Sequence, residues 1–478
     1  MAEFKNIIKH SRNYLIANIA TKALAFITIP VYTRLLSTNE YGTISIFLSV
    51  STILSSIMAL SMDRSISRYY FDQKDIDDFR QFNGTTFILS IFAFILTSLI
   101  IFKYSKNIGN IVNLESNIVI LLIPFSLINI IALSFQQIYG PRKESKLIAT
   151  TSLFQAYIGF SMSILFVAFL PIEKHFSVIL GKILGGIIIC FFYIKYIKPF
   201  FKLYFGIFYV RYIFTYSVPL IPYALSGVII EQFGKIALGS TQSVSDAGYY
   251  SLALAIGSLV SIIIGVTHQA WNPYFMEYMN DKNYKQLDSD YIRIFKITII
   301  VAFFIASFGY EIGLILAKRE FTESLYLIPI FTIGYVFYQL SYTYLRNFGY
   351  SKKTYLLTIT VLLSGISNLL FNYFLIPVLN ELGATLAFVG SYIIMAALGY
   401  LINRFFLKTH ATSLKELLTP FFISVPFYIF LIFIYSLDLS ALIILIKTGM
   451  FLLLTYFILI GEKTAIINIS KRFLASRK

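Results

Sequence analysis

Apolar residues in this chain gather into blocks of about 20, the length that a helix needs to cross the ~30 Å hydrocarbon core of a membrane. The blocks recur along all 478 residues; 58% of the residues are hydrophobic and only 13% are charged. A soluble core could not bury that much apolar surface. The sequence therefore predicts an all-α polytopic membrane protein and excludes a soluble enzyme.

A sliding hydropathy window predicts about fourteen transmembrane helices. The first follows a short basic N-terminus with no small-residue cleavage site, so we expect it to be retained. We expect the spans at about 14–36, 41–62, 83–102, 118–138, 147–170, 176–197, 212–236, 247–267, 292–316, 324–346, 354–376, 384–405, 415–436 and 441–460.

The distribution of Lys and Arg predicts the orientation of these spans. The N-terminus, the loops after even-numbered spans and the C-terminal tail hold 29 of the 39 basic residues, whereas the other side holds 7. Because basic loops stay in the cytoplasm, we expect both termini there, in a multi-pass protein of the plasma (cell inner) membrane. The net charge of +16 then reflects topology, and no nucleic-acid partner is expected.

Catalytic and metal-binding patterns are missing from the sequence. The single cysteine, Cys190, excludes a disulfide framework, and the four His show no ligand spacing. The longest outer loop, residues 103–117, is too short for a catalytic domain. We therefore expect no enzyme activity, no cofactor and no metal. Uphill transport would have to use a proton or sodium gradient or the gradient of the substrate itself.

A weak internal repeat appears when the chain is compared with itself at a constant offset, the one that places Glu40 on Asp246. Its matches fall at turn positions, which predicts an N-terminal six-helix lobe (1–210), a C-terminal six-helix lobe (211–410), and an additional helix pair with a basic tail (411–478). Six is an even number, so the lobes are parallel, and we expect them to form a V around a central cavity. The matches pair Glu40, Gly42 and Ser45 with Asp246, Gly248 and Ser251; Ser145 and Lys146 with Ser351 and Lys352; and Pro171 with Pro377.

Charged residues inside spans are costly and usually face a cavity or a partner. In span 1, Lys22 lies about 12 Å from the cytoplasmic end by helix rise, within a polar stripe that includes Asn18. We predict that both line the cavity, although Lys22 could instead pair with a neighbouring group for packing. Lys182, Lys447 and Glu311 lie closer to the outer interface, where we expect snorkelling.

Two further positions are candidates for substrate contact or coupling. Arg64 and Arg68 lie four residues apart on one helix face, which suits a phosphate, although topology alone also explains arginines there. Glu231 and Lys235 favour a local ion pair, and Glu231 could instead carry a coupling proton. In the same span, Pro219 and Pro222 interrupt helical hydrogen bonding and predict a hinge.

Several stretches resemble the polysaccharide flippases, the Wzx-like branch of the multidrug/oligosaccharidyl-lipid/polysaccharide (MOP) exporter superfamily. The resemblance covers about residues 10–406. The stretches are TRLLSTNEYGTISIF (33–47), DRSISRYYFDQKD (63–75), YSVPLIPYALS (216–226), DAGYYSLALAIGSLV (246–260), QAWNPYFMEY (269–278), and LRNFGYSKKTYLL leading to NYFLIPVLNELGATLAF (345–388).

The resemblance implies alternating access, in which a polyprenyl-pyrophosphate-linked oligosaccharide moves from the inner to the outer leaflet through a cationic cavity. The product would be a surface polysaccharide such as the O-antigen of lipopolysaccharide, a capsule or an exopolysaccharide. Implied partners are the lipid-linked oligosaccharide, membrane lipids, and the polymerase and chain-length machinery. Lys22 matches a basic position of the family, and Arg68 matches the Arg that closes span 2. Span 7 departs from the family pattern, with Gly234-Lys235 where relatives commonly have Asp-Arg.

Two other functions remain open at this point. An ion-coupled multidrug or small-molecule exporter of the same superfamily would share the lobes, but should have an acid-rich cavity suited to cationic drugs. A membrane glycan polymerase would act on the same lipid-linked sugars, but should carry a large outer loop with catalytic residues.

Overall fold

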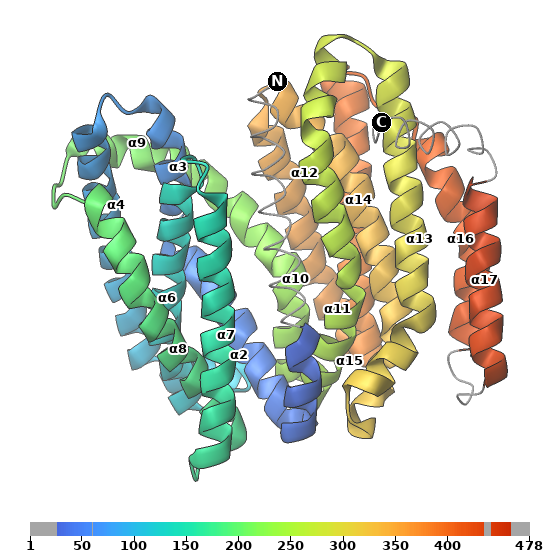
Figure 1. The fold of residues 1–478 in the computed structure, drawn as a ribbon, viewed down its shortest axis with the longest axis horizontal. Coiled ribbons are helices and arrows are strands. Elements are labelled where there is room, and N and C mark those ends of the chain that lie inside the picture. Colours follow the sequence, from blue (N-terminus) through green and yellow to red (C-terminus); the bar gives the residue numbers. More distant parts are fainter. Residues whose placement is uncertain (1–25, 60, 435–440, 460–478) are drawn as a thin grey trace, which may run out of the picture.

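The computed structural model describes residues 26–59, 61–434 and 441–459, and these ranges are built from helices (Figure 1). A helical stretch at 26–35 leads into α2. The elements that follow are α2 (Thr38–Ala59), α3 (Met62–Asp72), α4 (Ile76–Lys103), α5 (Ser105–Val112), α6 (Ser116–Tyr139), α7 (Ser145–Phe169), α8 (Lys174–Ile197), η1 (Lys198–Phe200), α9 (Ile207–Ser217), η2 (Val218–Leu220), α10 (Ile221–Thr241), α11 (Val244–Gly257), α12 (Leu259–Asn280), α13 (Tyr284–Leu316), η3 (Arg319–Leu327), α14 (Ile328–Tyr350), α15 (Thr354–Leu401), η4 (Ile402–Leu407), α16 (Leu414–Ile434) and α17 (Ala441–Leu459).

The expected all-α polytopic membrane fold is confirmed. Within the described ranges, twelve helical segments are long and apolar enough to cross a membrane. They cover every span expected from residue 41 onward, because the segment Thr354–Leu407 contains two of them. Its α15 is broken at Asn380, which has φ 48° and ψ −128°. The two arms are antiparallel, since Asn368 Nδ2 donates to Ser391 Oγ at 3.0 Å. Most of the first expected span, 14–36, lies outside the described residues.

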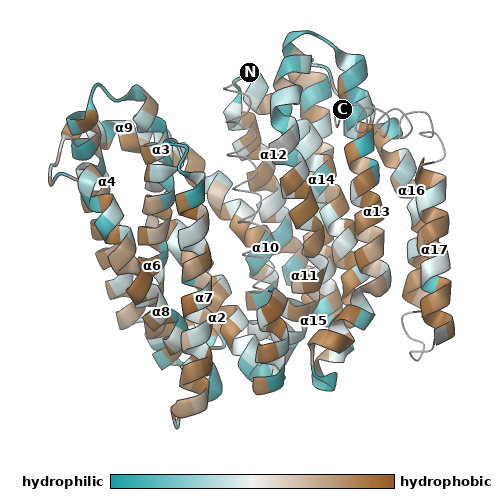
Figure 2. Cartoon of the chain, in the orientation of Figure 1, coloured by the Kyte–Doolittle hydropathy of each residue, from teal (hydrophilic) through white to brown (hydrophobic). Residues whose placement is uncertain are grey.

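The surface is organised as a membrane would require. Figure 2 shows apolar residues along the middle of the helices and polar residues at the two ends. Large apolar side chains such as Phe102, Phe191 and Phe433 are exposed, although a soluble protein would bury them. Since helices satisfy their own backbone hydrogen bonds, such a surface can face lipid.

The helices form two groups with a pair at one side (Figure 1). One group contains α3, α4 and α6–α9, the other contains α10–α15, and α16 with α17 packs on α13. Helix α2 runs between the two groups and packs on α6 in the first and on α10 and α11 in the second. We call residues 26–217, which comprise the first group together with α2 and α5, lobe 1, and we call the second group lobe 2.

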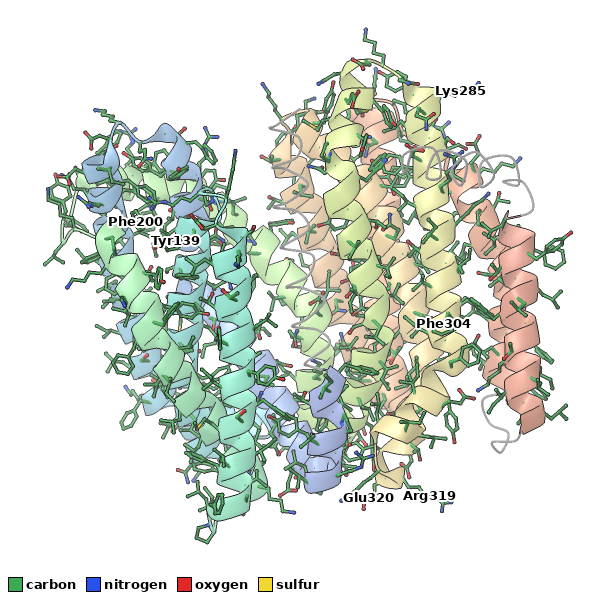
Figure 3. The ribbon with its side chains drawn as sticks, viewed as in Figure 1. Tyr139, Phe200, Lys285, Phe304, Arg319 and Glu320 are labelled. Carbon is green, nitrogen blue, oxygen red and sulfur yellow. The ribbon has the colours of Figure 1, made fainter. Side chains whose placement is uncertain are left out.

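The two ends of the molecule differ in charge. Lys285 lies at the end that carries the turns 140–144, 281–283 and 351–353, and Arg319 with Glu320 lies at the other (Figure 3). We call these the basic end and the opposite end. At the basic end, Arg142 Cζ lies 3.3 Å from the centroid of the Phe200 ring, and burial lowers the pKa of this guanidinium. A cation stacked on an aromatic ring in this way fastens the 140–144 turn to the linker that follows α8.

The internal repeat is visible in matching helix starts. At the start of α2, Ser37 N donates to Glu40 Oε2 at 2.8 Å and Glu40 N donates to Ser37 Oγ at 3.2 Å. At the start of α11, Ser243 and Asp246 form the same reciprocal capping box. Each box satisfies helix N–H groups that would otherwise lack partners. The predicted offset, which places Glu40 on Asp246, is therefore correct at this position.

The offset is wrong for the turns after α6 and α14. Lys143 and Lys352 both adopt left-handed backbone conformations, with φ 62° and 56°. Each amide donates to a glycine carbonyl three residues earlier, Gly140 and Gly349 respectively. Lys143 is thus the structural equivalent of Lys352, whereas the predicted offset paired Lys146 with Lys352. The predicted pairing of Ser145 with Ser351 is therefore three residues out of register.

The lobes touch at the opposite end. A Cβ atom on Gly42 would collide with the Val244 carbonyl, and one on Gly248 would lie 2.5 Å from the Thr38 oxygen. Because Thr38 and Val244 are related by the same offset as Gly42 and Gly248, the contact is reciprocal and has pseudo-twofold symmetry. Hydrogen bonds at the same end also join the lobes: Thr33 Oγ1 donates to the Leu316 carbonyl at 3.0 Å, and Asn113 Nδ2 donates to the Gly239 carbonyl at 2.9 Å.

Candidate functional site

A cavity of about 410 Å³ lies between the lobes. Its wall combines two lysines with hydroxyl groups on an otherwise apolar and aromatic lining. Lys182 comes from α8 in lobe 1, and Lys235 comes from α10 in lobe 2. The aliphatic hydroxyl groups of the lining belong to Thr28, Ser45, Ser251 and Ser258. Two cations in a mainly apolar and aromatic wall suit an anion that has lost its hydration shell. We call this space the lysine cavity.

Lys235 is held by a short chain of polar contacts that crosses to α2. Its Nζ donates to Gln232 Oε1 at 3.0 Å, and Ser49 Oγ donates to the same oxygen at 3.0 Å. Glu231 lies close enough to interact with the charge of Lys235. The ion-pair hypothesis for Glu231 and Lys235 therefore does not describe the whole arrangement, because Lys235 also lines the cavity.

Lys182 does not reach for the membrane interface as expected. Its Nζ lies 5.6 Å from the centroid of the Tyr32 ring, and both residues line the lysine cavity. A half-buried ammonium near an aromatic face gains cation–π attraction while keeping access to a ligand. The snorkelling interpretation of Lys182 is therefore wrong.

A second, smaller pocket of about 240 Å³ lies between α3, α10, α14 and α15. Arg64 from α3 and Glu231 from α10 contribute its charged groups. Four tyrosines supply most of its aromatic surface: Tyr223, Tyr338, Tyr342 and Tyr392. Arg64 Cζ lies 5.4 Å from the centroid of the Tyr223 ring. We call this space the tyrosine pocket.

A row of residues on α10 connects the two spaces. Tyr223, Gly227, Glu231 and Lys235 follow one another at intervals of four residues, so each lies beside the next in a row that turns gradually around the helix. The first three line the tyrosine pocket, and Lys235 lines the lysine cavity. By helix rise this row of residues extends about 18 Å from Tyr223 to Lys235. The structure thus places Arg64 and Glu231 in one pocket, with Lys235 one helical turn beyond Glu231 in the other space.

Other predicted site residues lie elsewhere. Lys22 and Asn18 are outside the described residues. Arg68 forms a salt bridge with Asp72, with Nε 3.2 Å from Oδ2, and Asp72 also accepts a 2.6 Å hydrogen bond from the Tyr212 hydroxyl of α9. Arg68 is more than half exposed, and this geometry gives it a role in joining α3 to α9.

The predicted hinge prolines stand at helix starts. Pro219 lies in the first turn of η2, and Pro222 lies in the first turn of α10. A proline in the first turn removes no helical hydrogen bond, because the N–H groups there have no partner within the helix. The two prolines therefore separate α9, which packs on α3 and α4, from α10, which packs on α15.

A buried ion pair lies outside the cavities. Lys447 Nζ of α17 is 2.7 Å from Glu311 Oε1 of α13, and the lysine side chain is 2% exposed. Snorkelling was expected for both residues, and that interpretation is wrong for Lys447, because its ammonium lies buried against a carboxylate. The pair fastens the additional helix pair to lobe 2.

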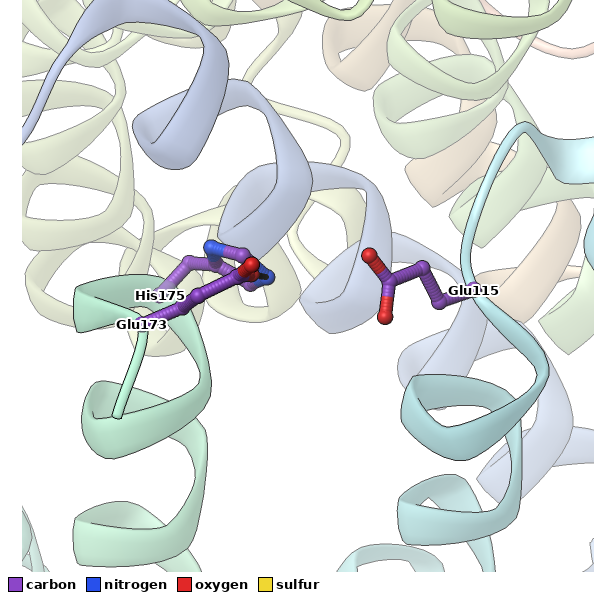
Figure 4. A group of neighbouring side chains, drawn as sticks. All are labelled: Glu115, Glu173 and His175. Carbon is purple, nitrogen blue, oxygen red and sulfur yellow. Dashed lines mark ion pairs between the residues drawn. The ribbon is translucent and has the colours of Figure 1, made fainter. Parts of the chain in front are cut away.

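Three possible metal ligands meet at the opposite end. Glu115, Glu173 and His175 place one ligand atom each within 4.8 Å of one another (Figure 4). The His175 ring pairs with Glu173 at 3.2 Å, and both glutamates are exposed. Exposed groups of this kind are common in proteins without a metal, so the geometry alone does not make a metal site. Sequence spacing could not reveal it, because Glu115 comes from a distant loop.

Comparisons with known proteins agree with the fold and the resemblance. The family described as "Polysaccharide biosynthesis protein" matches residues 8–279, more than half of the chain. A curated protein of the Lsg locus of Haemophilus influenzae is 24% identical over 295 residues, which cover 58% of this chain and 67% of that protein.

Solved structures of two transporters have the same fold. The lipid II flippase MurJ, in an inward closed conformation, aligns with a TM-score of 0.70 at 15% identity, over 95% of this chain and 99% of its own. An inward-facing multidrug resistance MATE family transporter of the MOP superfamily aligns with a TM-score of 0.63 at 13% identity, over 80% and 94% of the two chains.

Proposed function

Since this chain belongs to the polysaccharide biosynthesis protein family, we propose that it is a flippase for a polyprenyl-pyrophosphate-linked oligosaccharide. It moves one repeat unit from the cytoplasmic to the outer leaflet of the plasma membrane. The repeat unit then enters a surface polymer such as an O-antigen, a capsule or an exopolysaccharide. Its partners in the membrane are the lipid-linked substrate and the polymerase and chain-length machinery that use the product.

The observation that carries this proposal is the pair of lysines facing one cavity from different lobes. A pyrophosphate with attached sugars is too polar to cross hydrocarbon unaided. Lys182 and Lys235 offer charge-assisted hydrogen bonds that offset the loss of water around the phosphates. Because one lysine belongs to each lobe, a bound pyrophosphate would contact both moving parts.

The contacts between the lobes support a mechanism of alternating access. Residues 1–210 and 211–410 would act as the two moving parts, with both termini in the cytoplasm. The lobes touch at the opposite end around Gly42 and Gly248, which fits a state closed to the outside. Pro219 and Pro222 would let α10 change its angle to α9. Lys22, Asn18 and Arg64 extend the cationic path in this proposal, and a proton or sodium gradient would supply energy if transport is uphill.

A multidrug exporter of the same superfamily is the alternative that the fold leaves open. Glu231 in the tyrosine pocket would suit a cationic drug, as acidic cavities do. The two lysines of the larger cavity disfavour such a ligand because like charges repel in a desolvated site. We therefore place lipid-linked oligosaccharide ahead of cationic drugs.

The proposal is tested by measuring lipid-linked oligosaccharides by mass spectrometry in a strain lacking the gene. We expect one completed repeat unit to accumulate on its lipid and the surface polymer to disappear. The wild-type gene should reverse both changes. Unchanged lipid-linked pools would contradict the proposal, and drug-efflux assays on the same strains would then examine the multidrug alternative.

A further inference from the structure

The tyrosine pocket has a composition different from that of the lysine cavity. It presents one guanidinium, one carboxylate and four phenol rings. The lysine cavity presents two ammonium groups and hydroxyl groups, and its described lining includes no carboxylate. A carboxylate repels phosphate, so the pocket that contains Glu231 is poorly suited to the charged part of a lipid-linked substrate. The two spaces are therefore suited to different chemical groups.

The tyrosine rings meet at steep angles. The ring centroids of Tyr338 and Tyr342 lie 5.3 Å apart with planes at 82°, and those of Tyr338 and Tyr392 lie 5.0 Å apart at 55°. Rings that meet edge to face do not cover one another's faces as stacked rings do. They form a concave aromatic corner, with Arg64 and Glu231 at its border.

A sugar ring has the complementary chemistry. Its C–H groups carry a small positive charge and are attracted to the negative face of an aromatic ring, while its hydroxyls both donate and accept hydrogen bonds. A carboxylate can accept from a pair of hydroxyls, and a guanidinium can donate to a pair. At about 240 Å³ the pocket is smaller than the roughly 300–1,000 Å³ typical of drug-sized ligands, so it suits one sugar better than a whole oligosaccharide.

We propose that the tyrosine pocket is the sugar-recognition subsite of this protein, and that it holds the sugar nearest the pyrophosphate. The proposal rests on the proposed flippase function and adds to it the site where the glycan is recognised. Glu231 and Lys235 are four residues apart, or about 6 Å along α10 by helix rise. A pyrophosphate at Lys235 and the sugar attached to it can therefore contact both residues.

Gly227 offers a direct way to block this subsite. It lines the pocket, and a Cβ atom added there would meet nothing within 4 Å. Gly227→Leu should therefore fill the pocket without forcing the helices apart. Gly449 of α17 has equally open space around an added Cβ and lies outside both cavities, so Gly449→Leu is a matched control.

Binding should be measured with two lipids and purified protein in detergent. One is the lipid-linked oligosaccharide isolated from the deletion strain, and the other is undecaprenyl pyrophosphate, which carries no sugar. We expect Gly227→Leu to weaken binding of the first lipid tenfold or more and to leave binding of the second unchanged. Gly449→Leu should change neither. Lys235→Ala should weaken binding of both lipids.

A second pair of variants separates the aromatic ring from its hydroxyl. Tyr338→Phe keeps the ring and should retain most of the affinity for the lipid-linked oligosaccharide. Tyr338→Leu should lose affinity for that lipid and keep its affinity for undecaprenyl pyrophosphate. If Gly227→Leu lowers the affinity for both lipids equally, or for neither, the sugar-recognition subsite is contradicted but the proposed flippase function is not. Failure of the wild-type protein to bind either lipid would contradict the flippase function itself.

Discussion

Gly42 of α2 and Gly248 of α11 lie in contact across the interface between the lobes, and each also packs against the first turn of the other's helix. The backbone atoms approach so closely that neither position has room for a side chain. This contact joins α2 to α11 at the opposite end of the molecule, and its reciprocity follows from the repeat.

Gly248→Leu is expected to open that end. The added side chain would collide with the Thr38 carbonyl of α2, so the closed contact cannot form. A reporter cysteine at Ser45, which lines the lysine cavity, would be placed in a protein whose Cys190 is replaced by Ser. We expect faster labelling by a membrane-impermeant maleimide added outside intact cells. Gly265→Leu, where an added Cβ meets open space, should leave labelling unchanged. Unchanged labelling in Gly248→Leu as well would contradict this role of the contact.

Removing the cavity lysines should weaken substrate binding. A charge-assisted hydrogen bond contributes about 1.5–3 kcal/mol, so Lys235→Ala or Lys182→Gln should each reduce affinity for undecaprenyl pyrophosphate by about 10- to 100-fold. Lys235→Arg, which keeps the charge, should retain part of the affinity. Lys285→Ala removes the same charge from an exposed position at the start of α13, at the basic end, and serves as the control. An equal loss of affinity in Lys285→Ala would contradict a specific role of the cavity lysines and indicate an effect of the overall charge of the protein.

The two prolines between α9 and α10 should matter for movement more than for stability. Replacing Pro219 and Pro222 together by Ala would allow a continuous helix, which stiffens the link between the lobes. Because both prolines stand in first turns, we expect the melting temperature to stay the same or to rise. Transport by the double variant should fall at least tenfold, measured in reconstituted vesicles. Full transport would show that no hinge is needed there.

The Lys447–Glu311 pair should behave as a buried ion pair does. Lys447→Met would leave the carboxylate without its partner in an apolar setting, at a cost of about 3–5 kcal/mol in unfolding free energy. The double variant Lys447→Met/Glu311→Leu should recover most of that loss, because no charge is then left buried. Thermal unfolding in detergent measures both variants. A single variant as stable as wild type would mean that the pair contributes little.

The helical spans from residue 41 onward could be predicted from the sequence because apolar runs depend only on local composition. The repeat could be predicted at Gly42 and Gly248, where capping residues and a close contact restrict the choice of side chain. It could not be aligned at Lys143 and Lys352, because a turn at the membrane surface tolerates a change of three residues in length.

The candidate site was only partly predictable. Arg64, Glu231 and Lys235 were selected as charged residues near or within apolar spans, but spacing along the chain cannot say which helices face one another. Lys182 was missed because its depth alone fits snorkelling, and only its position beside Tyr32 shows that it faces the cavity. The four-residue intervals between Tyr223, Gly227, Glu231 and Lys235 were available in the sequence and would have indicated that each residue lies beside the next along α10.

The central claim is tested most directly by measuring flipping with purified protein. Liposomes would contain the lipid-linked oligosaccharide from the deletion strain, and an impermeant lectin added outside would report the accessible sugar. With wild-type protein we predict that the whole pool becomes accessible, whereas protein-free liposomes and the Lys182→Gln/Lys235→Ala variant should expose only the outer-leaflet fraction. Wild-type liposomes that expose no more sugar than protein-free ones would contradict the account.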